Sequence, residues 1–345
     1  MNLTHKTLWL AAVYSSLALS LSACRQPSSV SPSVSIEPDL IIFTSQEENI
    51  YEHIIKEFKE RTGYVVDVKT GAPQELLAMA SSGDKTETGD LLFGIGVETL
   101  EASKSILEPY KSADADQISE AFQSPDNSWT SFSALPLVII YNTKVVTYRE
   151  VPVGWKSLLE PRWKGRIAFV DPTRSDLYAA ALVTAASRTS QEDYLPLLLE
   201  NLNYMTLPDF STVNEKVADG QYSLGVTLEG AAQSMLARGD DIDYLYPGEG
   251  VAAIPDGTAI LKNCPHPEAA RQFVDFTVSD DVQRILGARL NRRSVRKDIL
   301  PSTGLTSTGQ LPLINFDLNT YSRQKQEVLE AWRSLLNRHD EEVRP

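Results

Sequence analysis

Short apolar runs alternate with segments that carry a single apolar face. Residues 40–43 are continuously apolar, as in a buried strand, and Ile50, Ile54 and Phe58 then recur at helical spacing. Ser45 to Glu48 form a capping box in front of this helix, which should end before Gly63. Strand followed by helix, repeated, is typical of an α/β architecture. The pattern predicts strands at 40–43, 64–68 and 91–93, and helices before residue 63, at 74–80 and from 97 onward.

The alternation continues through the second half of the chain. After a strongly apolar strand predicted at 135–141, the composition changes around Trp155 and Trp163, and we place the first crossing between two lobes here. The predicted return strand covers 251–261. Further strands are expected at 167–170 and 222–226, with helices at 173–187, 230–238 and after 267. The predicted lobes are 39–140 with 252–290, and 141–251, followed by a C-terminal helical segment at 291–345 that packs on them.

The N-terminal apolar run, residues 8–19, precedes a cysteine. It follows Lys6, resembles the apolar region of a secretory signal, and is too short to span a bilayer as a stable helix. Residues 21–24, Leu-Ser-Ala-Cys, resemble the lipobox of bacterial lipoproteins, which implies cleavage before Cys24 and its acylation. We expect a signal peptide at 1–23 and a Ser/Pro-rich tether at 24–38. A cleaved secretory peptide with an incidental cysteine is the alternative.

This anchor predicts an extracytoplasmic protein, tethered by lipid to the outer face of the cytoplasmic membrane or in the periplasm. Composition excludes several other roles. A formal net charge of -14, without a basic stripe, disfavours nucleic acid as a partner. Besides Cys24 only Cys264 is present, which leaves no disulfide framework and no cysteine cage for a metal.

Sparse histidines argue against catalysis. The four histidines are widely separated, and the chain has no Gly-x-Ser-x-Gly motif, so nothing indicates a zinc site or a Ser-His-Asp triad. We therefore expect no enzyme, no cofactor and no resident metal. The remaining composition, 42% hydrophobic and 23% charged, is ordinary for a protein with two lobes.

Several segments, in a fixed order, carry a resemblance to a known family. They are residues 43–48 after the first strand, Gly71 before a helix, Tyr141-Asn142, residues 255–261 and residues 267–276. From residue 39 to about 336 the chain resembles the extracellular solute-binding proteins of ABC importers, in the subgroup that binds ferric iron, hexose phosphates or aminoethylphosphonate. The resemblance implies an α/β fold with two doubly wound lobes joined by hinge strands, as in type II periplasmic binding proteins. It also implies a small-molecule ligand that is passed to a membrane permease with its ATPase, and we expect a monomer.

Candidate ligand-binding residues follow from the rule that open α/β sheets bind ligands beyond the carboxyl ends of their strands. Arg174 stands beside a predicted helix N-terminus, and this combination favours an oxyanion cradle. Structural roles are the alternatives: Ser45 as a helix cap, the glycines in tight turns, and Glu229 as a solvated charge. The predicted residues are Thr44, Ser45, Gln46, Gly71, Ala72 and Gly94 in one lobe, and Asp171, Thr173, Arg174, Ser175 and Glu229 in the other.

The residues also bear on the ligand class. The iron-binding relatives supply two adjacent tyrosines after a strand of the second lobe, as oxygen ligands for ferric iron. The corresponding residues 225–230 contain no tyrosine, and Tyr244 and Tyr246 are spaced like core or rim residues of one strand. We therefore expect an organic anion that bears phosphate or phosphonate. The alternatives are ferric iron as ligand, a ligand sensor for a membrane kinase, and an extracytoplasmic hydrolase.

Overall fold

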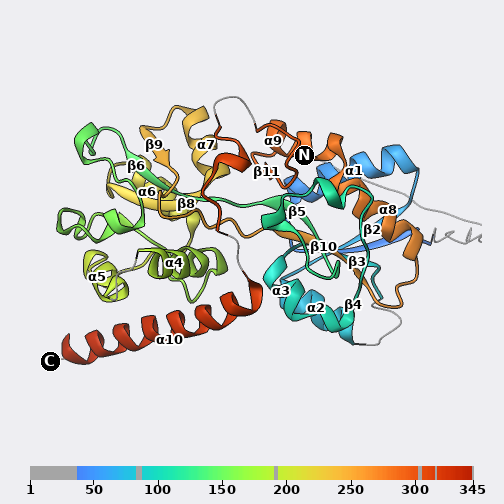
Figure 1. Ribbon diagram of the computed structural model, residues 1–345, viewed down its shortest axis with the longest axis horizontal. Helices are drawn as coiled ribbons and strands as arrows, with labels where there is room; N and C mark the ends of the chain where they lie inside the picture. Colours follow the sequence, from blue (N-terminus) through green and yellow to red (C-terminus); the bar gives the residue numbers. More distant parts are fainter. Residues whose placement is uncertain (1–36, 83–87, 190–192, 302–304, 315–316, 344–345) are drawn as a thin grey trace, which may run out of the picture. The chain divides into compact units, whose positions relative to one another are not determined.

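The computed structural model describes residues 37–82, 88–189, 193–301, 305–314 and 317–343. In these residues the strands gather into two sheets, and helices lie against both (Figure 1). Residues 1–36, which contain the predicted signal peptide, Cys24 and most of the tether, lie outside the described residues. Within the described ranges, none of the helices combines the length and the hydropathy needed to cross a bilayer.

Seven of the described strands form the first sheet. They are β1 (Leu40–Thr44), β2 (Val66–Thr70), β3 (Leu91–Gly96), β4 (Leu107–Glu108), β5 (Thr130–Ala134), β10 (Asp256–Leu261) and β11 (Arg293–Ser294). Their order is β11-β5-β10-β3-β1-β2, with β4 paired to β10. The sheet is mixed, because β1 is parallel to β2 and β3 whereas β10 is antiparallel to β3 and β5.

Four of the described strands form the second sheet. They are β6 (Leu137–Asn142), β7 (Ile167–Ala168), β8 (Leu224–Leu228) and β9 (Ile242–Leu245). Their order is β7-β8-β6-β9, with β7 parallel to β8 and β6 antiparallel to both of its neighbours. Two mixed sheets with helices between their strands confirm the predicted α/β class.

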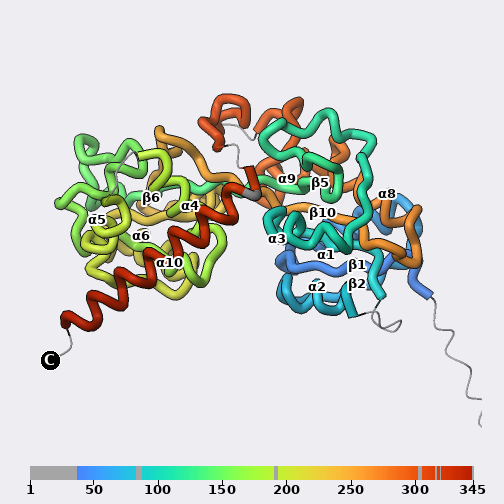
Figure 2. Tube along the Cα trace, turned by 60° about the horizontal axis from the view of Figure 1, so that its bottom comes forward, coloured from blue at the N-terminus to red at the C-terminus, as the bar shows by residue number. Residues whose placement is uncertain are grey.

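Helices accompany each sheet (Figure 2). With the first sheet lie α1 (Glu48–Thr62), α2 (Pro73–Ser81), α3 (Val97–Ala102), α8 (Pro267–Val278) and α9 (Asp280–Arg289). With the second lie α4 (Asp176–Arg188), α5 (Tyr194–Asn201), α6 (Phe210–Ala218), α7 (Glu229–Arg238) and α10 (Leu318–Val343). Short 3-10 helices are η1 (Lys104–Ile106), η2 (Ala115–Gln117), η3 (Glu120–Phe122), η4 (Tyr148–Glu150), η5 (Trp155–Leu159), η6 (Pro161–Trp163) and η7 (Thr308–Gln310).

Aromatic and aliphatic side chains fill the core beneath each sheet. In the first, Phe273 of α8 meets Phe58 of α1 and Phe93 of β3 edge to face, with ring centroids 5.1 and 5.3 Å apart. In the second, Trp332 of α10 is fully buried, with its ring centroid 6.2 Å from that of Phe169. Burial of a large apolar side chain contributes about 1.5–3 kcal/mol. One cluster of buried residues belongs to the first sheet alone, and a second cluster extends from the first sheet to the second.

The chain passes from the first sheet to the second at Leu135 and Pro136, between β5 and β6. The predicted hinge strand at 135–141 is therefore shorter than expected, because Pro136 has no backbone N–H to continue a ladder. Tyr141 lies inside the second sheet, paired with Leu224 and Asp243, and not at the crossing. The lobe boundaries drawn at 140 and 251 stay a prediction.

The return passage is also irregular where a continuous strand was predicted. β10 begins at Asp256, and residues 251–255 cross between the sheets beside the first passage. Leu137 N donates to Ala252 O at 2.9 Å, and Val251 N donates to Pro312 O at 2.8 Å. Three segments of the chain, around residues 136, 252 and 312, are therefore hydrogen-bonded to one another between the two sheets.

Candidate functional site

Side-chain hydrogen bonds fasten the carboxyl end of β1 to that of β3. The Thr44 hydroxyl donates to Phe93 O, and the Ser45 hydroxyl donates to Gly94 O, each at 2.9 Å. The predicted capping box at Ser45 is wrong: α1 begins at Glu48 with Glu47 as N-cap, without a side-chain cap. The reason is that the neighbouring strand end takes the Ser45 hydroxyl, an interaction that lies 49 residues away in sequence.

Gln46 and Gly94 lie together at the same edge of the first sheet. The backbone of Gly94 has φ +69°, and a Cβ there would overlap the Gln46 side chain, so the position needs glycine for two reasons. The Gln46 amide donates to Asp256, a carboxylate that is 4% exposed. Ser133 donates to the other oxygen of Asp256 through its backbone N–H at 2.9 Å and its hydroxyl at 2.7 Å. Sequence reasoning missed Asp256 as the residue that organises this edge.

Gly71 and Ala72 form the turn that leads from β2 into α2. Gly71 N donates to Thr44 O at 3.2 Å, which places this turn beside the end of β1. Ala72 is the N-cap residue of α2, and its N–H donates to the Glu75 carboxylate at 3.2 Å. The first-lobe candidates therefore lie together at the carboxyl ends of the strands β1, β2 and β3.

In the second lobe, the segment before α4 forms a turn around Asp171. The Asp171 carboxylate accepts from Thr173 N at 2.9 Å and from its hydroxyl at 2.8 Å. Ser175 is the N-cap residue of α4 but makes no side-chain cap hydrogen bond. The Thr173 hydroxyl donates back to Asp171 and therefore does not bind the backbone N–H groups at the start of α4. The Arg174 side chain is exposed.

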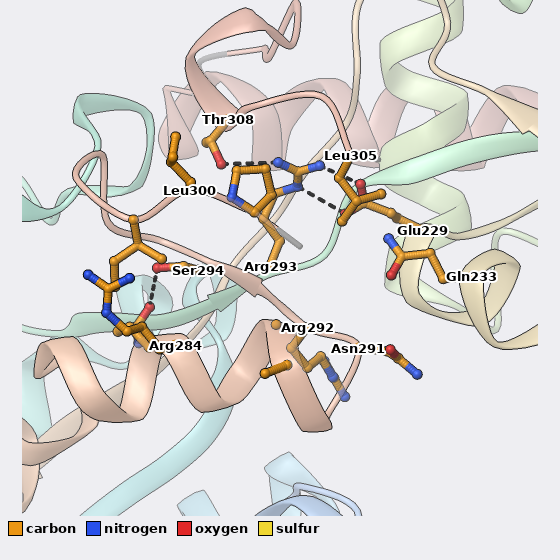
Figure 3. A pocket seen from close by; sticks show the side chains of 15 residues that line it. Glu229, Gln233, Arg284, Asn291, Arg292, Arg293, Ser294, Leu300, Leu305 and Thr308 are labelled. Carbon is orange, nitrogen blue, oxygen red and sulfur yellow. Dashed lines mark hydrogen bonds and ion pairs between the residues drawn. The ribbon is translucent and has the colours of Figure 1, made fainter. Parts of the chain in front are cut away.

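Glu229 is the first residue of α7 and is 3% exposed, so the alternative of a solvated charge is wrong. Arg293 of β11 binds both of its oxygens, with Nε 2.9 Å from Oε2, and also donates to Thr306 O and the Thr308 hydroxyl (Figure 3). The Tyr246 hydroxyl donates to the same carboxylate. Because β11 belongs to the first sheet and α7 to the second lobe, this buried ion pair joins the two lobes.

A cavity of about 280 Å³ opens beside this ion pair, where the starts of α1 and α7 lie across from each other. It shares Glu229, Arg292 and Arg293 with a second cavity of about 220 Å³ whose side chains Figure 3 draws. The first cavity is lined by Glu47, Asn49, Ile50, Ala134, Leu135, Pro136, Leu228, Glu229, Gly230, Ala231, Ser234, Arg289, Leu290, Asn291, Arg292 and Arg293. It lies at the carboxyl end of β8, and of the eleven residues predicted from the sequence only Glu229 lines it.

Arg292 supplies positive charge to this cavity. Its side chain is 15% exposed and points away from that of Arg293 (Figure 3). Its guanidinium forms an ion pair with the buried carboxylate of Asp256, with Nη1 3.7 Å from Oδ2, a separation too long for a hydrogen bond. The first N–H groups of α7, at Gly230 and Ala231, carry the positive end of the helix dipole to the same cavity. Anions are the species that such a set of donors prefers.

Two further observations concern metal binding. Within the described ranges, no three His, Cys, Asp or Glu side chains are grouped so that they could hold a metal ion. The rings of Tyr244 and Tyr246 are in contact, with centroids 5.7 Å apart at 88°. Burial, together with the charge of Glu229, raises the pKa of Tyr246 far above its usual range, and burial also raises the pKa of Tyr244. Both hydroxyls therefore keep their protons.

Comparisons with known proteins place this site in context. A family model described as bacterial extracellular solute-binding protein matches residues 90–300. Iron uptake protein A1 of Synechocystis sp. is 24% identical over 284 residues, 77% of this chain and 79% of that protein. The periplasmic binding protein AfuA from Actinobacillus pleuropneumoniae, solved with exogenous fructose-6-phosphate bound, superimposes with TM-score 0.71 at 22% identity, over 86% of this chain and 98% of that one.

A second similar structure is described as a two-component system protein that mediates signal transduction. It superimposes with TM-score 0.72 at 25% identity and covers 83% of this chain and 99% of that one. These structures confirm the predicted type II periplasmic binding fold. The family match extends over more than half of the chain and includes the second sheet, α7 and most of the 280 Å³ cavity's lining. The chain therefore belongs to the bacterial extracellular solute-binding proteins, a family of non-enzymatic components that bind small ligands for transport.

Proposed function

We propose that this protein captures an organic anion bearing phosphate or phosphonate and delivers it to the permease and ATPase of an ABC importer. The observation that carries the proposal is the convergence of Arg292 and the N-terminus of α7 on one cavity at the carboxyl end of β8. A guanidinium binds a phosphate oxygen through charge-assisted hydrogen bonds, which are roughly twice as strong as neutral ones. Backbone N–H groups at a helix start add donors that need no side chain.

Glycine at position 230 fits this role. A Cβ there would overlap the carbonyl oxygen of Asn291, so residue 230 offers only its backbone. The same packing opposes the ferric-iron alternative, since no tyrosine fits at this place after β8. Tyr246 is already engaged elsewhere, because its hydroxyl donates to the Glu229 carboxylate. Iron uptake protein A1 is thus a relative in sequence whose ligand we do not assign to this chain.

Five of the eleven residues predicted from the sequence enter the proposal, with different roles. Thr44, Gln46 and Gly94 hold the strand ends in place, and Glu229 fixes the start of α7 through Arg293. We propose that Arg174 is a second anion contact, reached from the exposed turn before α4. Arg292 is the contact on the side of α7.

Calorimetry with a ligand panel tests the proposed function. Glucose 6-phosphate and aminoethylphosphonate represent the two phosphorus chemistries, unphosphorylated glucose is the matched control, and ferric citrate represents the alternative. We expect binding heat from at least one phosphorus compound and none from glucose. A coloured ferric complex of high affinity, with no heat from either phosphorus compound, would overturn the proposal.

A ligand sensor is the second candidate. The specific observation in its favour is the 25% identical structure described as a two-component system protein that mediates signal transduction. A sensor and an importer component bind ligand in the same way and differ in their membrane partner. Uptake of radiolabelled ligand by cells with and without the protein separates the two functions. If the protein is a sensor, its loss leaves the initial rate of uptake unchanged in cells that already contain the transporter.

Ligand should draw the two lobes together. We propose that they rotate about the crossing passages at 135–136 and 251–255, near the hinge predicted at Tyr141 and Val251. Small-angle scattering should show a smaller radius of gyration at saturating ligand, while far-ultraviolet circular dichroism stays unchanged because each lobe moves as a body. An unchanged radius of gyration at saturation would count against closure.

The lipid anchor is a separate proposal, motivated by residues 21–24. Cys24→Ser should release the protein from the membrane fraction without changing ligand affinity, because the tether precedes the first strand by fifteen residues or so. Cell fractionation and calorimetry on the same preparation measure both. A serine variant that stays with membranes after a salt wash would contradict the anchor.

A further inference from the structure

The C-terminal helix α10 belongs to the second lobe but begins beside the first. Trp332, halfway along it, is buried against Phe169 of the second lobe, and the helix packs along α4 and α5. Its first turns lie next to α3 of the first lobe in both views (Figure 1, Figure 2). Lys325, in the second turn of α10, stands where these elements meet.

Lys325 binds one carboxylate from each lobe. Its ammonium lies 3.0 and 3.1 Å from the two oxygens of Glu98 in α3, and 2.7 Å from Asp176, the first residue of α4. The side chains of Lys325 and Glu98 are 16% and 17% exposed, whereas that of Asp176 is 73% exposed. The contact with Glu98 is therefore largely shielded from water, where charge-assisted hydrogen bonds are stronger than at an open surface.

Without the ammonium, the same place would hold two like charges from different lobes. Burial raises the pKa of Glu98, Lys325 opposes this rise, and the negative charge of Asp176 adds to it. Burial alone would lower the pKa of Lys325, but its bonds to Asp176 and Glu98 outweigh burial and raise it. The lysine thus stays charged and converts a repulsion between the lobes into an attraction.

We infer that Lys325 is a positioning residue for ligand capture, one that holds the start of α4 against α3 and so favours the arrangement of the two lobes seen in this structure over wider ones. Asp176 directly follows the turn of Thr173 to Ser175, so the position of that turn relative to the first lobe depends on this contact. A contact present in this arrangement and lost when the lobes separate shifts the population toward the arrangement that contains it. The inference rests on the proposed closure but not on the identity of the ligand.

Lys104 offers a matched control. Its ammonium lies 2.6 Å from Glu101 of α3 and 3.6 Å from Asp126, and both partners belong to the first lobe. Lys104→Met therefore removes a lysine from a similar pair of carboxylates, next to the same helix, without removing a contact between lobes. Lys325→Arg keeps the charge and should preserve the bridge.

Distances between spin labels test the inference without any ligand. Labels at Lys56 of the first lobe and Tyr148 of the second, both exposed, are read by pulsed electron resonance in the mature chain with Cys24→Ser and Cys264→Ala. Lys325→Met should shift the label separation to longer distances, and Lys325→Arg and Lys104→Met should not. Asp176→Asn, at an exposed position, should give a smaller shift in label separation. It replaces Lys325→Met as the test variant if Lys325→Met folds poorly.

Ligand affinity gives the second readout. With glucose 6-phosphate as the probe, the dissociation constant of Lys325→Met should rise about tenfold, since part of the binding free energy then goes into closing the lobes. Label distances that are the same in Lys325→Met and wild type, with and without the probe, would overturn the inference. If wild type gives no heat with the probe, the proposed ligand class has failed, while the distances still decide the role of Lys325.

Discussion

Replacing Glu229 by alanine will destabilise the protein by about 3–5 kcal/mol, the usual cost of leaving one member of a buried ion pair without its partner. Both side chains of the Glu229–Arg293 pair are almost fully buried, at 3% and 2% exposed. The guanidinium would lose its bidentate carboxylate and keep only Thr306 O, the Thr308 hydroxyl and Tyr246. Chemical denaturation followed by circular dichroism measures the change in free energy of unfolding.

Two further variants show whether the loss comes from the stranded charge. Glu229→Ala combined with Arg293→Met should be less destabilised than Glu229→Ala alone, because no unpaired charge remains in the interior. Glu200→Gln removes a partner from the Lys164–Glu200 pair, in which both side chains are 52% exposed, and should change stability by less than about 1 kcal/mol. A loss in Glu229→Ala no larger than that in Glu200→Gln would contradict the structural role of the pair.

The second large effect is on ligand binding. Arg292→Gln should weaken the binding of a phosphorylated or phosphonate ligand by about 1.5–3 kcal/mol, the scale of a charge-assisted hydrogen bond. This corresponds to a roughly ten- to hundredfold rise in dissociation constant. Arg174→Ala should cost a similar amount if the turn before α4 also contacts the anion. Calorimetry with the phosphorus compound that gives the largest heat in wild type measures both.

Arg238→Gln is the matched control, because Arg238 lies at the far end of α7 and pairs with Asp240 at the surface. It removes the same charge from the same helix without touching the cavity, so binding should stay as in wild type. If only Arg174→Ala lowers the ligand affinity, the anion binds at the start of α4. Unchanged affinity in both Arg292→Gln and Arg174→Ala would contradict an anion site at either arginine.

Local patterns predicted the main elements of the fold. The apolar face of Ile50, Ile54 and Phe58 is buried as expected. The helix predicted at 74–80 is one residue longer at each end, and the helix predicted at 230–238 begins one residue earlier. Such elements bury one regular face, so their period is visible in the sequence itself. The passages between the sheets were harder to locate, since residues 251–255 are as apolar as a strand but pair irregularly with Pro136 and Leu313.

The sequence did not reveal the partners of the candidate residues. The strand-end rule selected Gln46, Gly94 and Glu229, of which Glu229 lines the 280 Å³ cavity. Their partners Asp256 and Arg293 come from 210 and 64 residues further along the chain, and only the sheet order brings them near. The adjacent arginines 292 and 293 are visible in the sequence as a pair of positive charges. Nothing in the sequence indicates that they lie beside the end of β8.

The short-range capping motifs failed where another group competed for the same hydroxyl. Ser45 and Thr173 both stood at sites typical of helix caps, yet their hydroxyls bind Gly94 O and Asp171 respectively. A capping hydrogen bond contributes about 1 kcal/mol, which a bond to a neighbouring strand or turn can match. A serine or threonine at a position typical of helix caps therefore indicates where the helix begins. It is a less reliable indication of what the side-chain hydroxyl binds.

Native mass spectrometry of a competition mixture tests the central claim most directly. The protein would be mixed with equal concentrations of glucose 6-phosphate, aminoethylphosphonate, glucose and ferric citrate, and the mass of the bound species read from the intact complex. We predict a complex of one protein with one phosphorus-containing compound, strongly reduced in Arg292→Gln. A complex with ferric iron or with glucose, formed equally by wild type and Arg292→Gln, would contradict the claim that this cavity binds an organic phosphate or phosphonate.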